Sequence, residues 1–266
     1  EGPQTLSVLH LSDLHFVRED RRKAEFLASL PPADVTVVTG DFLAEPEAVE
    51  TTVEAVRATR GRLASWFVLG SNDYYVPRPM NPLAYFRSHA LRTGRRARRG
   101  RAGDLRTLLQ DDGWRDLTNV RGDVDLDGLP VELLGLDDAH IWRADLRLAP
   151  RRAPERFGLA VMHSPDSVPE AVACGYRLVV AGHTHGGQVR VPLVGALVTN
   201  SDLPRRLVSG AIRFGDTVVH VSPGLGTSKY APFRFLCRPE ATLLELRRTP
   251  AEGGPSRTND RAAQPQ

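Results

Sequence analysis

Five short apolar segments of this 266-residue chain each run directly into side chains that can bind a metal ion. The segments are 6–11, 35–39, 63–69, 159–162 and 178–181, and the side chains that follow them are, in order, Asp13 and His15, Asp41, Asn72 and Asp73, His163, and His183 and His185. Strands that alternate with helices form parallel sheets, and ligands placed after the strands converge at one edge of such a sheet. The pattern therefore predicts an α/β fold with its functional site at the carboxyl ends of the strands.

The spacing between these segments predicts the covering helices. Residues 19–30, 45–60 and 104–112 have helical patterns, and further strands are expected at 131–136, 188–191, 217–222 and 241–247. We expect one domain over residues 1–248, with an exposed Arg-rich insertion at about 77–103, and a disordered tail over 249–266. The two cysteines, Cys174 and Cys237, are expected to be small buried residues.

The spacing within the polar clusters favours a metal centre. Asp13 and His15 are two residues apart, as are His183 and His185, so on an extended segment both members of a pair lie on one face. Two such pairs, a bridging carboxylate and another imidazole supply enough ligands for two divalent cations about 3.5–4 Å apart. Mixed imidazole and carboxylate ligands suit Mn, Fe or Zn better than Ca or Mg, and we expect Mn first.

In order and context, these residues resemble the calcineurin-like metallophosphoesterase superfamily. Its pattern of Asp-x-His, Gly-Asp, Gly-Asn-His-Asp/Glu, His and Gly-His-x-His corresponds here to 12–15, 40–41, 70–73, His163 and 182–185. The resemblance covers about residues 6–247 and implies a four-layer α/β/β/α sandwich. The segments Gly182–Val191, with Gly-His-Thr-His-Gly-Gly-Gln, and Ser222–Thr227 resemble a bacterial branch that is often membrane-anchored or exported, with several members that act on envelope or lipid-linked phosphoesters.

The resemblance also implies a role for each residue. Asp13, His15 and His185 would hold the first metal, and Asp41 would bridge both metals. His163 and His183 would hold the second metal together with an Asn. A hydroxide that bridges the two metals would attack phosphorus in line, and the metals would neutralise the charge that develops on the phosphoryl oxygens.

One block departs from the family pattern, because Gly-Asn-His-Asp is replaced by Gly70-Ser71-Asn72-Asp73. An ungapped alignment places Ser71 at the ligand position and Asn72 at the position of the proton-donating His. A carboxamide oxygen is the better metal ligand, so we expect the loop to shift and Asn72 to bind the second metal. In either register the usual general acid, a histidine, is missing, and Asn cannot donate a proton to a leaving alkoxide at neutral pH.

Two explanations remain open for the missing acid. The substrate has a good leaving group, such as phosphate in a pyrophosphate linkage, or another residue donates the proton. His140 is the candidate, since it also follows a strand, and its alternative is a surface histidine that caps a helix. Asp73 either orients a ligand or lies in a surface turn, whereas His10 and His220 are expected to be structural.

Positive charge is concentrated in one stretch. Residues 87–106 contain eight arginines and one aspartate, while the net charge of the whole chain is only +3. The stretch is a solvated loop, a contact with anionic lipid or a contact with nucleic-acid backbone. No aromatic residues alternate with the arginines, so we favour peripheral membrane contact through Arg87–Arg106 over nucleic acid.

Together these features predict a metal-dependent phosphoesterase that hydrolyses a phosphodiester or pyrophosphate bond of a lipid-linked or envelope metabolite. The alternatives are a binding or scaffold protein that has kept the fold and lost turnover, and a metal-dependent nuclease. We expect a bacterial protein that is membrane-associated or in the envelope if an upstream anchor has been removed, and cytoplasmic otherwise.

Overall fold

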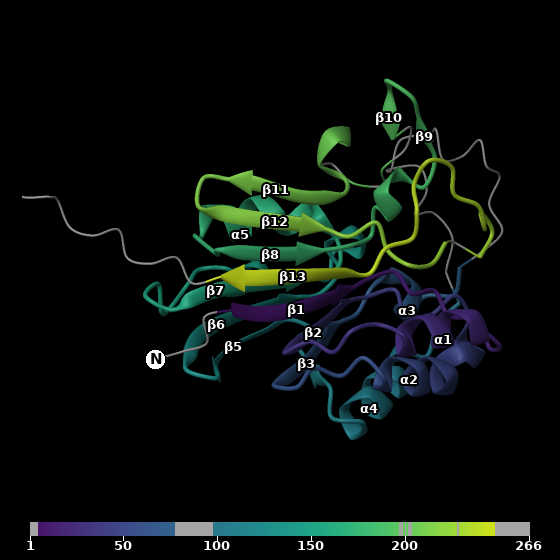
Figure 1. Ribbon diagram of the computed structural model, residues 1–266, viewed down its shortest axis with the longest axis horizontal. Helices are drawn as coiled ribbons and strands as arrows, with labels where there is room; N and C mark the ends of the chain where they lie inside the picture. Colours follow the sequence, from purple (N-terminus) through teal and green to yellow (C-terminus); the bar gives the residue numbers. More distant parts are fainter. Residues whose placement is uncertain are drawn as a thin grey trace, which may run out of the picture.

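The computed structural model describes residues 5–77, 98–196, 199, 201, 204–227 and 229–247. It contains two mixed sheets that lie face to face (Figure 1). The first sheet has the order β13-β1-β2-β3-β4, from β13 (Thr242–Arg247), β1 (Thr5–Leu11), β2 (Val35–Thr39), β3 (Ala64–Val68) and β4 (Arg115–Asp116). Strands β1 to β4 are parallel, and β13 pairs with β1 in the antiparallel direction.

The second sheet has the order β11-β12-β8-β7-β6-β5. Its strands are β5 (Val120–Leu126), β6 (Leu129–Leu136), β7 (Phe157–Met162), β8 (Leu178–Ala181), β11 (Gly210–Phe214) and β12 (Thr217–Val221). The four central strands, β6, β7, β8 and β12, are parallel, whereas β5 and β11 are antiparallel edges. A short hairpin of β9 (Arg190–Val191) and β10 (Gly195–Ala196) stands apart from both sheets.

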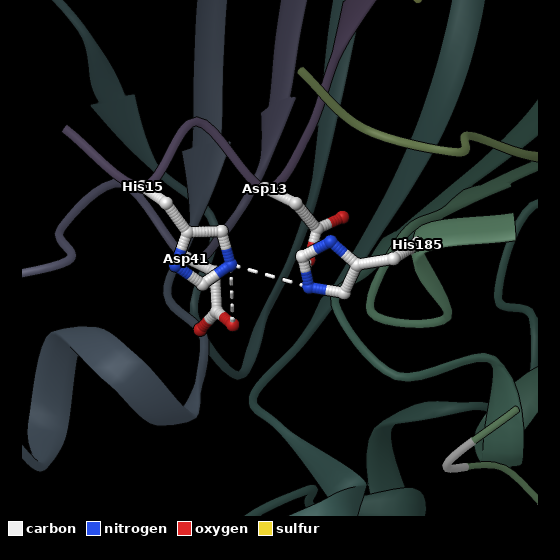
Figure 2. A group of neighbouring side chains, drawn as sticks. All are labelled: Asp13, His15, Asp41 and His185. Carbon is white, nitrogen blue, oxygen red and sulfur yellow. Dashed lines mark hydrogen bonds and ion pairs between the residues drawn. The ribbon is translucent and has the colours of Figure 1, made fainter. Parts of the chain in front are cut away.

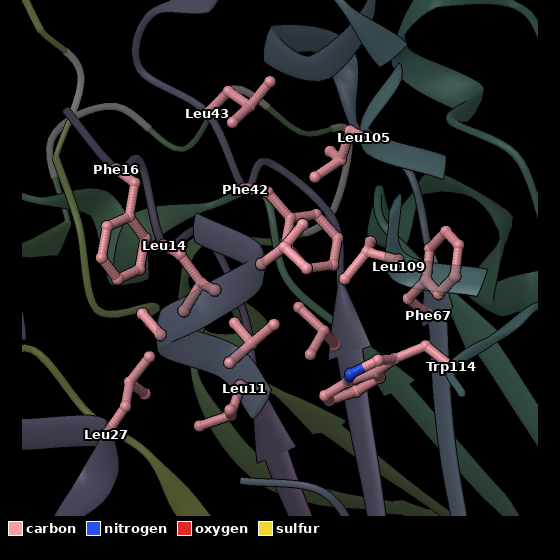
Figure 3. Close-up of a cluster of buried hydrophobic side chains, with 14 of the residues drawn as sticks. Leu11, Leu14, Phe16, Leu27, Phe42, Leu43, Phe67, Leu105, Leu109 and Trp114 are labelled. Carbon is pink, nitrogen blue, oxygen red and sulfur yellow. The ribbon is translucent and has the colours of Figure 1, made fainter. Parts of the chain in front are cut away.

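Alternation along the strands builds the layers, because successive side chains point to opposite faces of a sheet. In β1, Leu6 and Val8 enter the core between the two sheets, whereas Leu9 and Leu11 face the helices. That outer core lies under α1 (Arg21–Ala28), α2 (Val49–Arg57) and α4 (Ala102–Asp111), and its large side chains are shown in Figure 3. A third core lies under α5 (Val168–Ala173) on the far face of the second sheet. The predicted four-layer α/β/β/α sandwich is confirmed.

Several predicted boundaries were wrong by a few residues. The helix expected at 45–60 is a 3-10 turn, η1 (Pro46–Ala48), followed by α2, and the helix expected at 19–30 is the shorter α1. Strands β5 and β11 were missed, since their edge positions leave alternate residues polar or exposed. Most of the predicted Arg-rich insertion and the whole predicted tail lie outside the described residues.

Candidate metal centre

The predicted ligands follow the carboxyl ends of parallel strands from both sheets. Asp13 and His15 follow β1, Asp41 follows β2, and Asn72 lies on the short helix α3 (Ser71–Tyr74) after β3. His163 directly follows β7, and His183 and His185 follow β8, where His185 begins the 3-10 turn η7 (His185–Gly187). The two sheets face each other, so these loops meet at one edge of the sandwich, as the sequence pattern predicts.

The backbone at this edge is unusual. Eleven non-glycine residues in the described part of the chain have positive φ, and five of them are predicted ligands: Asp13, His15, Asp41, His183 and His185. This left-handed conformation costs energy in residues with a Cβ atom, and it persists where the surrounding structure enforces it, often at functional sites. The strained backbone lowers the stability of the fold and orients these side chains toward the site.

Four of the side chains form one compact group. Asp13, His15, Asp41 and His185 each offer a ligand atom, and these atoms all lie within 4.8 Å of one another (Figure 2). The Nε2 atoms of His15 and His185 are 3.2 Å apart. His15 Nε2 lies 3.6 Å from Asp41 Oδ2, and His185 Nε2 lies 3.5 Å from Asp13 Oδ1.

A second group continues from Asp41. His163 Nε2 lies 3.5 Å from Asp41 Oδ1, and His183 Nδ1 lies 3.2 Å from His163 Nε2. Asn72 also contacts Asp41, because its backbone N–H donates to Oδ1 at 2.8 Å and its side-chain amide donates to Oδ2 at 2.5 Å. Asp41 Oδ2 therefore contacts His15 and the Asn72 side chain, while Asp41 Oδ1 contacts His163 and the Asn72 backbone.

His140, the candidate proton donor, also lies in this region. It is on the 3-10 turn η4 (Ala139–Ile141) after β6, and its Nδ1 lies 3.1 Å from Nε2 of His183. The side chain is half-buried, at the outer end of the row of histidines. The structure thus brings together all seven predicted ligands and His140.

The donor set fits divalent cations. Within the described residues, Asp13 Oδ1 and His15 Nδ1 are buried without a hydrogen-bond partner, which is uncommon for buried polar atoms. His163 Nδ1 lies 2.6 Å from the Thr39 carbonyl and His185 Nδ1 lies 3.3 Å from the Gly226 carbonyl. A proton on each Nδ1 leaves the Nε2 lone pair directed into the cluster, which is how ligating histidines are usually oriented.

Burial keeps two of the imidazoles neutral. It lowers the pKa of His15 to about 4, and it lowers that of His185 to about 4 with help from the Arg234 guanidinium. Neutral imidazole is the form that binds a metal.

The pKa values of the buried carboxyl groups are shifted in different directions. Burial raises the pKa of Asp13, and it raises that of Asp138, beside the site, to about 7. Burial also opposes ionisation of Asp41, but the neighbouring His163 and His15 outweigh it and hold the Asp41 pKa well below its usual range. The buried acids at this edge favour the binding of positive charge.

Two supporting residues hold the ligand loops in place. Asp73 is buried and its carboxylate accepts hydrogen bonds from the backbone N–H groups of Gly70, Asp41 and Leu43 at 2.9–3.1 Å. Of the two alternatives for Asp73, the structure thus supports the one in which it orients a ligand. Arg234, which the sequence reasoning missed, donates to the carbonyl oxygens of His185 and Gly226.

The cysteines and the remaining buried histidines lie outside the candidate metal centre. Cys174 and Cys237 are both free; Cys237 is buried as expected, and Cys174 is only partly buried. His10 and His220 are structural, since they are buried with their Nδ1 atoms 2.8 Å apart. In the part of the chain that the structure describes, no helix has the length and apolar character needed to span a bilayer.

Comparison with known proteins agrees with this geometry. Residues 6–187 match the family described as calcineurin-like phosphoesterase. An uncharacterised metallophosphoesterase of Bacillus subtilis, YkuE, is 25% identical over 247 residues, which are 90% of this chain and 77% of that protein. The phosphodiesterase YaeI of Escherichia coli is 37% identical over 115 residues, which are 43% of this chain and 41% of that protein.

A cattle protein described as a transmembrane protein with a metallophosphoesterase domain is 28% identical over 258 residues. The match covers 92% of this chain and 54% of that protein. Because the family match spans more than half of the chain and ends among the histidines that the fold gathers at this edge, the chain belongs to the calcineurin-like phosphoesterase family and is a metal-dependent phosphoric ester hydrolase.

Proposed function

We propose that this protein hydrolyses a phosphodiester or pyrophosphate bond at a centre that holds two divalent cations on either side of Asp41. The position of Asp41 carries the proposal. Its Oδ2 faces His15 at 3.6 Å and its Oδ1 faces His163 at 3.5 Å, so one carboxylate serves two groups of ligands.

The ligand sets follow from these contacts. Asp13, His15, Asp41 and His185 would hold the first cation, and Asp41, Asn72, His163 and His183 would hold the second. We expect Mn, with Fe or Zn as alternatives, since the set mixes imidazole with oxygen ligands. Such a pair supplies Lewis acidity toward phosphoryl oxygens and lowers the pKa of water to the neutral range.

Asn72 supports the shifted register of its loop. Its side-chain amide donates to Asp41 Oδ2 and its backbone N–H donates to Oδ1, the oxygen that His163 faces, so its carboxamide lies beside the proposed bridging carboxylate. The role assigned to Asn72 is to bind the second cation and to fix the carboxylate of Asp41 through its backbone N–H.

His140 is assigned the proton transfer to the leaving group. It is half-buried and lies against His183, so it is held next to the ligand set and can still exchange protons with solvent. General acid catalysis is worth about 10²–10⁴-fold for poor leaving groups and little for good ones. A pyrophosphate substrate would need His140 less than a phosphodiester of an alcohol would.

A pocket of about 280 Å³ beside His15 offers room for the part of the substrate next to the scissile phosphate. Lys23 and Lys229 line it, and they are the only two lysines of the chain. Each already pairs with a carboxylate, Lys23 with Asp20 and Lys229 with Glu45. The pocket therefore suits a polar group of low net charge better than a second phosphate, and of the two proposed substrate types it favours the phosphodiester.

The substrate class that we propose is a lipid-linked or envelope metabolite, with peripheral membrane contact through Arg87–Arg106. The cattle relative that carries its metallophosphoesterase domain in a transmembrane protein supports the membrane setting. Residues 87–97 lie outside the described residues, and Arg101 and Arg106 pair with acids of the fold.

The test combines metal content with hydrolysis of a nitrophenyl phosphodiester in Mn²⁺. We expect two Mn²⁺ per chain in the wild type, and loss of metal and turnover in Asp41→Asn. The matched control is Asp216→Asn, at an exposed aspartate that pairs with Arg177 on the surface, and it should behave as the wild type does. Full hydrolysis after chelation of all metal would refute the proposal, and bound metal without hydrolysis would identify a scaffold protein.

A further inference from the structure

Exposed apolar side chains gather on two segments that lie beside the metal centre. Of the eleven large hydrophobic residues that are exposed in the described part of the chain, six belong to residues 193–194 and 230–236. We name these six residues the rim surface: Leu193, Val194, Tyr230, Phe233, Phe235 and Leu236. Contiguous exposed apolar patches on a soluble domain mark contact with a protein or a membrane.

Backbone hydrogen bonds make the two segments one surface. The N–H of Arg190 donates to the carbonyl of Phe235 at 3.0 Å, and the N–H of Phe235 donates to the carbonyl of Gln188, also at 3.0 Å. The side-chain amide of Gln188 donates to the carbonyl of Ala231 at 2.7 Å. Figure 1 shows the β9–β10 hairpin projecting beyond the sheets, next to the yellow segment that precedes β13.

This surface is anchored to the metal centre. Arg234, in the middle of the second segment, donates to the carbonyl of His185 at 3.2 Å. The Cys237 thiol donates to the same carbonyl at 3.2 Å. A ligand of the proposed first cation is thus held by the segment that carries four of the six rim-surface residues.

Two leucines of the rim surface, Leu193 and Leu236, have a backbone conformation that is unfavourable for leucine; we call these two residues the tips. Leu193 and Leu236 have φ of 66° and 50°, a region that glycine and asparagine occupy at lower cost. Both side chains nevertheless point into solvent, and that of Leu193 is fully exposed. The chain therefore presents apolar groups at two strained turns that contribute little to its own core.

The charge around these tips is positive. Residues 186–196 contain Arg190 and no acid, and residues 229–240 contain Lys229, Arg234 and Arg238 with only Glu240. The two stretches carry a formal net charge of +3; Lys229 pairs with Glu45 and Arg234 donates to backbone carbonyls, so Arg190 and Arg238 are the cations of these stretches that can meet headgroups. Protruding apolar and aromatic tips flanked by cations suit the interface of an anionic bilayer, where apolar side chains enter the acyl boundary and cations meet lipid headgroups.

We infer that the rim surface inserts into the interface of a membrane that contains anionic lipid. Insertion would hold the metal centre next to phosphoesters that the membrane presents, and this consequence rests on the proposed function. The surface differs from the Arg87–Arg106 stretch, and its contact combines apolar insertion with charge.

The experiment is co-sedimentation of the 266-residue chain with vesicles of phosphatidylcholine, alone or mixed with phosphatidylglycerol. The variant is Leu193→Asn with Leu236→Asn, because asparagine tolerates positive φ. The matched control is Leu146→Asn with Leu243→Asn, at two leucines that are each 41% exposed elsewhere. We expect the wild type and the control to bind the mixed vesicles, and the rim variant to bind at least about tenfold more weakly.

Metal content and hydrolysis of the soluble nitrophenyl diester should be equal in all three proteins. Failure of the wild type to bind the vesicles would overturn the inference. It would also be overturned if high salt abolished vesicle binding while the rim variant bound as tightly as the wild type, since that pattern is expected for contact through Arg87–Arg106. A wild-type dimer that the rim variant converts to a monomer, without vesicle binding, would make the surface a protein interface. Vesicle binding without hydrolysis of the nitrophenyl diester would contradict the proposed function and would still support this inference.

Discussion

Arg234 lies outside the proposed ligand set, and its loss should weaken the metal centre. Its guanidinium donates to the carbonyl oxygens of His185 at 3.2 Å and Pro223 at 2.8 Å, and also to that of Gly226. The Gly226 carbonyl in turn accepts from Nδ1 of His185 at 3.3 Å. Arg234 therefore fixes both the backbone of His185 and the group that sets the tautomer of its ring.

The size of the effect follows from these bonds. Arg234→Met keeps much of the side-chain volume and removes about three charge-assisted hydrogen bonds to partly buried carbonyls. Each is worth about 1.5–3 kcal/mol before the desolvation of the guanidinium is subtracted, so we expect a net loss of about 2–4 kcal/mol in the free energy of unfolding. Partners that orient a metal ligand change metal affinity about 10–100-fold, so we expect the Kd for Mn²⁺ to rise by that factor.

The assay is titration calorimetry with Mn²⁺, together with urea unfolding of the same samples. Arg234→Lys should restore part of the affinity, since an ammonium reaches fewer carbonyls. The control is Arg238→Met, at an exposed arginine four residues further along the same segment. If Arg234→Met bound Mn²⁺ with the affinity of the wild type while folded, the argument for its positioning role would be refuted.

Three further predictions concern other parts of the molecule. His140→Gln should slow hydrolysis of a diester with an alkyl leaving group about 10²–10⁴-fold and leave the nitrophenyl diester nearly unchanged; equal loss on both would remove His140 as the acid. Glu132→Gln should lower the free energy of unfolding by about 3–5 kcal/mol in urea titrations, because it leaves the buried Arg151 guanidinium, 2.9 Å away, without its counter-charge; a loss below about 1 kcal/mol would contradict this. Burial lowers the pKa values of His10 and His220, so below pH about 6.5 the unfolded chain binds protons that the folded chain does not. The free energy of unfolding should therefore decrease as the pH is lowered below about 6.5. With Mn²⁺ saturating, His220→Asn should make this pH dependence shallower, and an unchanged pH dependence would contradict the role of this histidine pair.

The sequence predicts the convergence of the ligands because topology decides it. Asp13 and His185 are 172 residues apart in the sequence. Each follows a parallel strand, and parallel strands present their carboxyl ends at one edge. His140 could be predicted in the same way, since it too follows a strand.

Other features depend on contacts that no local pattern encodes. Arg234 lies in a segment without regular structure, and its role exists only because that segment passes under the carbonyls of His185 and Gly226. Strand β5 alternates Arg121, Asp123 and Asp125 with less polar residues, which is typical of a solvated edge and equally of a loop. The rim surface could not be predicted either, because apolar residues are expected in the core unless the fold shows them exposed.

The most direct test of the central claim is a crystal structure of the Mn²⁺-loaded protein with an anomalous difference map recorded at the manganese edge. We predict two peaks, one on each side of the Asp41 carboxylate, with His15 and His185 at the first and His163 and His183 at the second. A map with one peak or none at Asp41, recorded from crystals of active protein, would contradict the account.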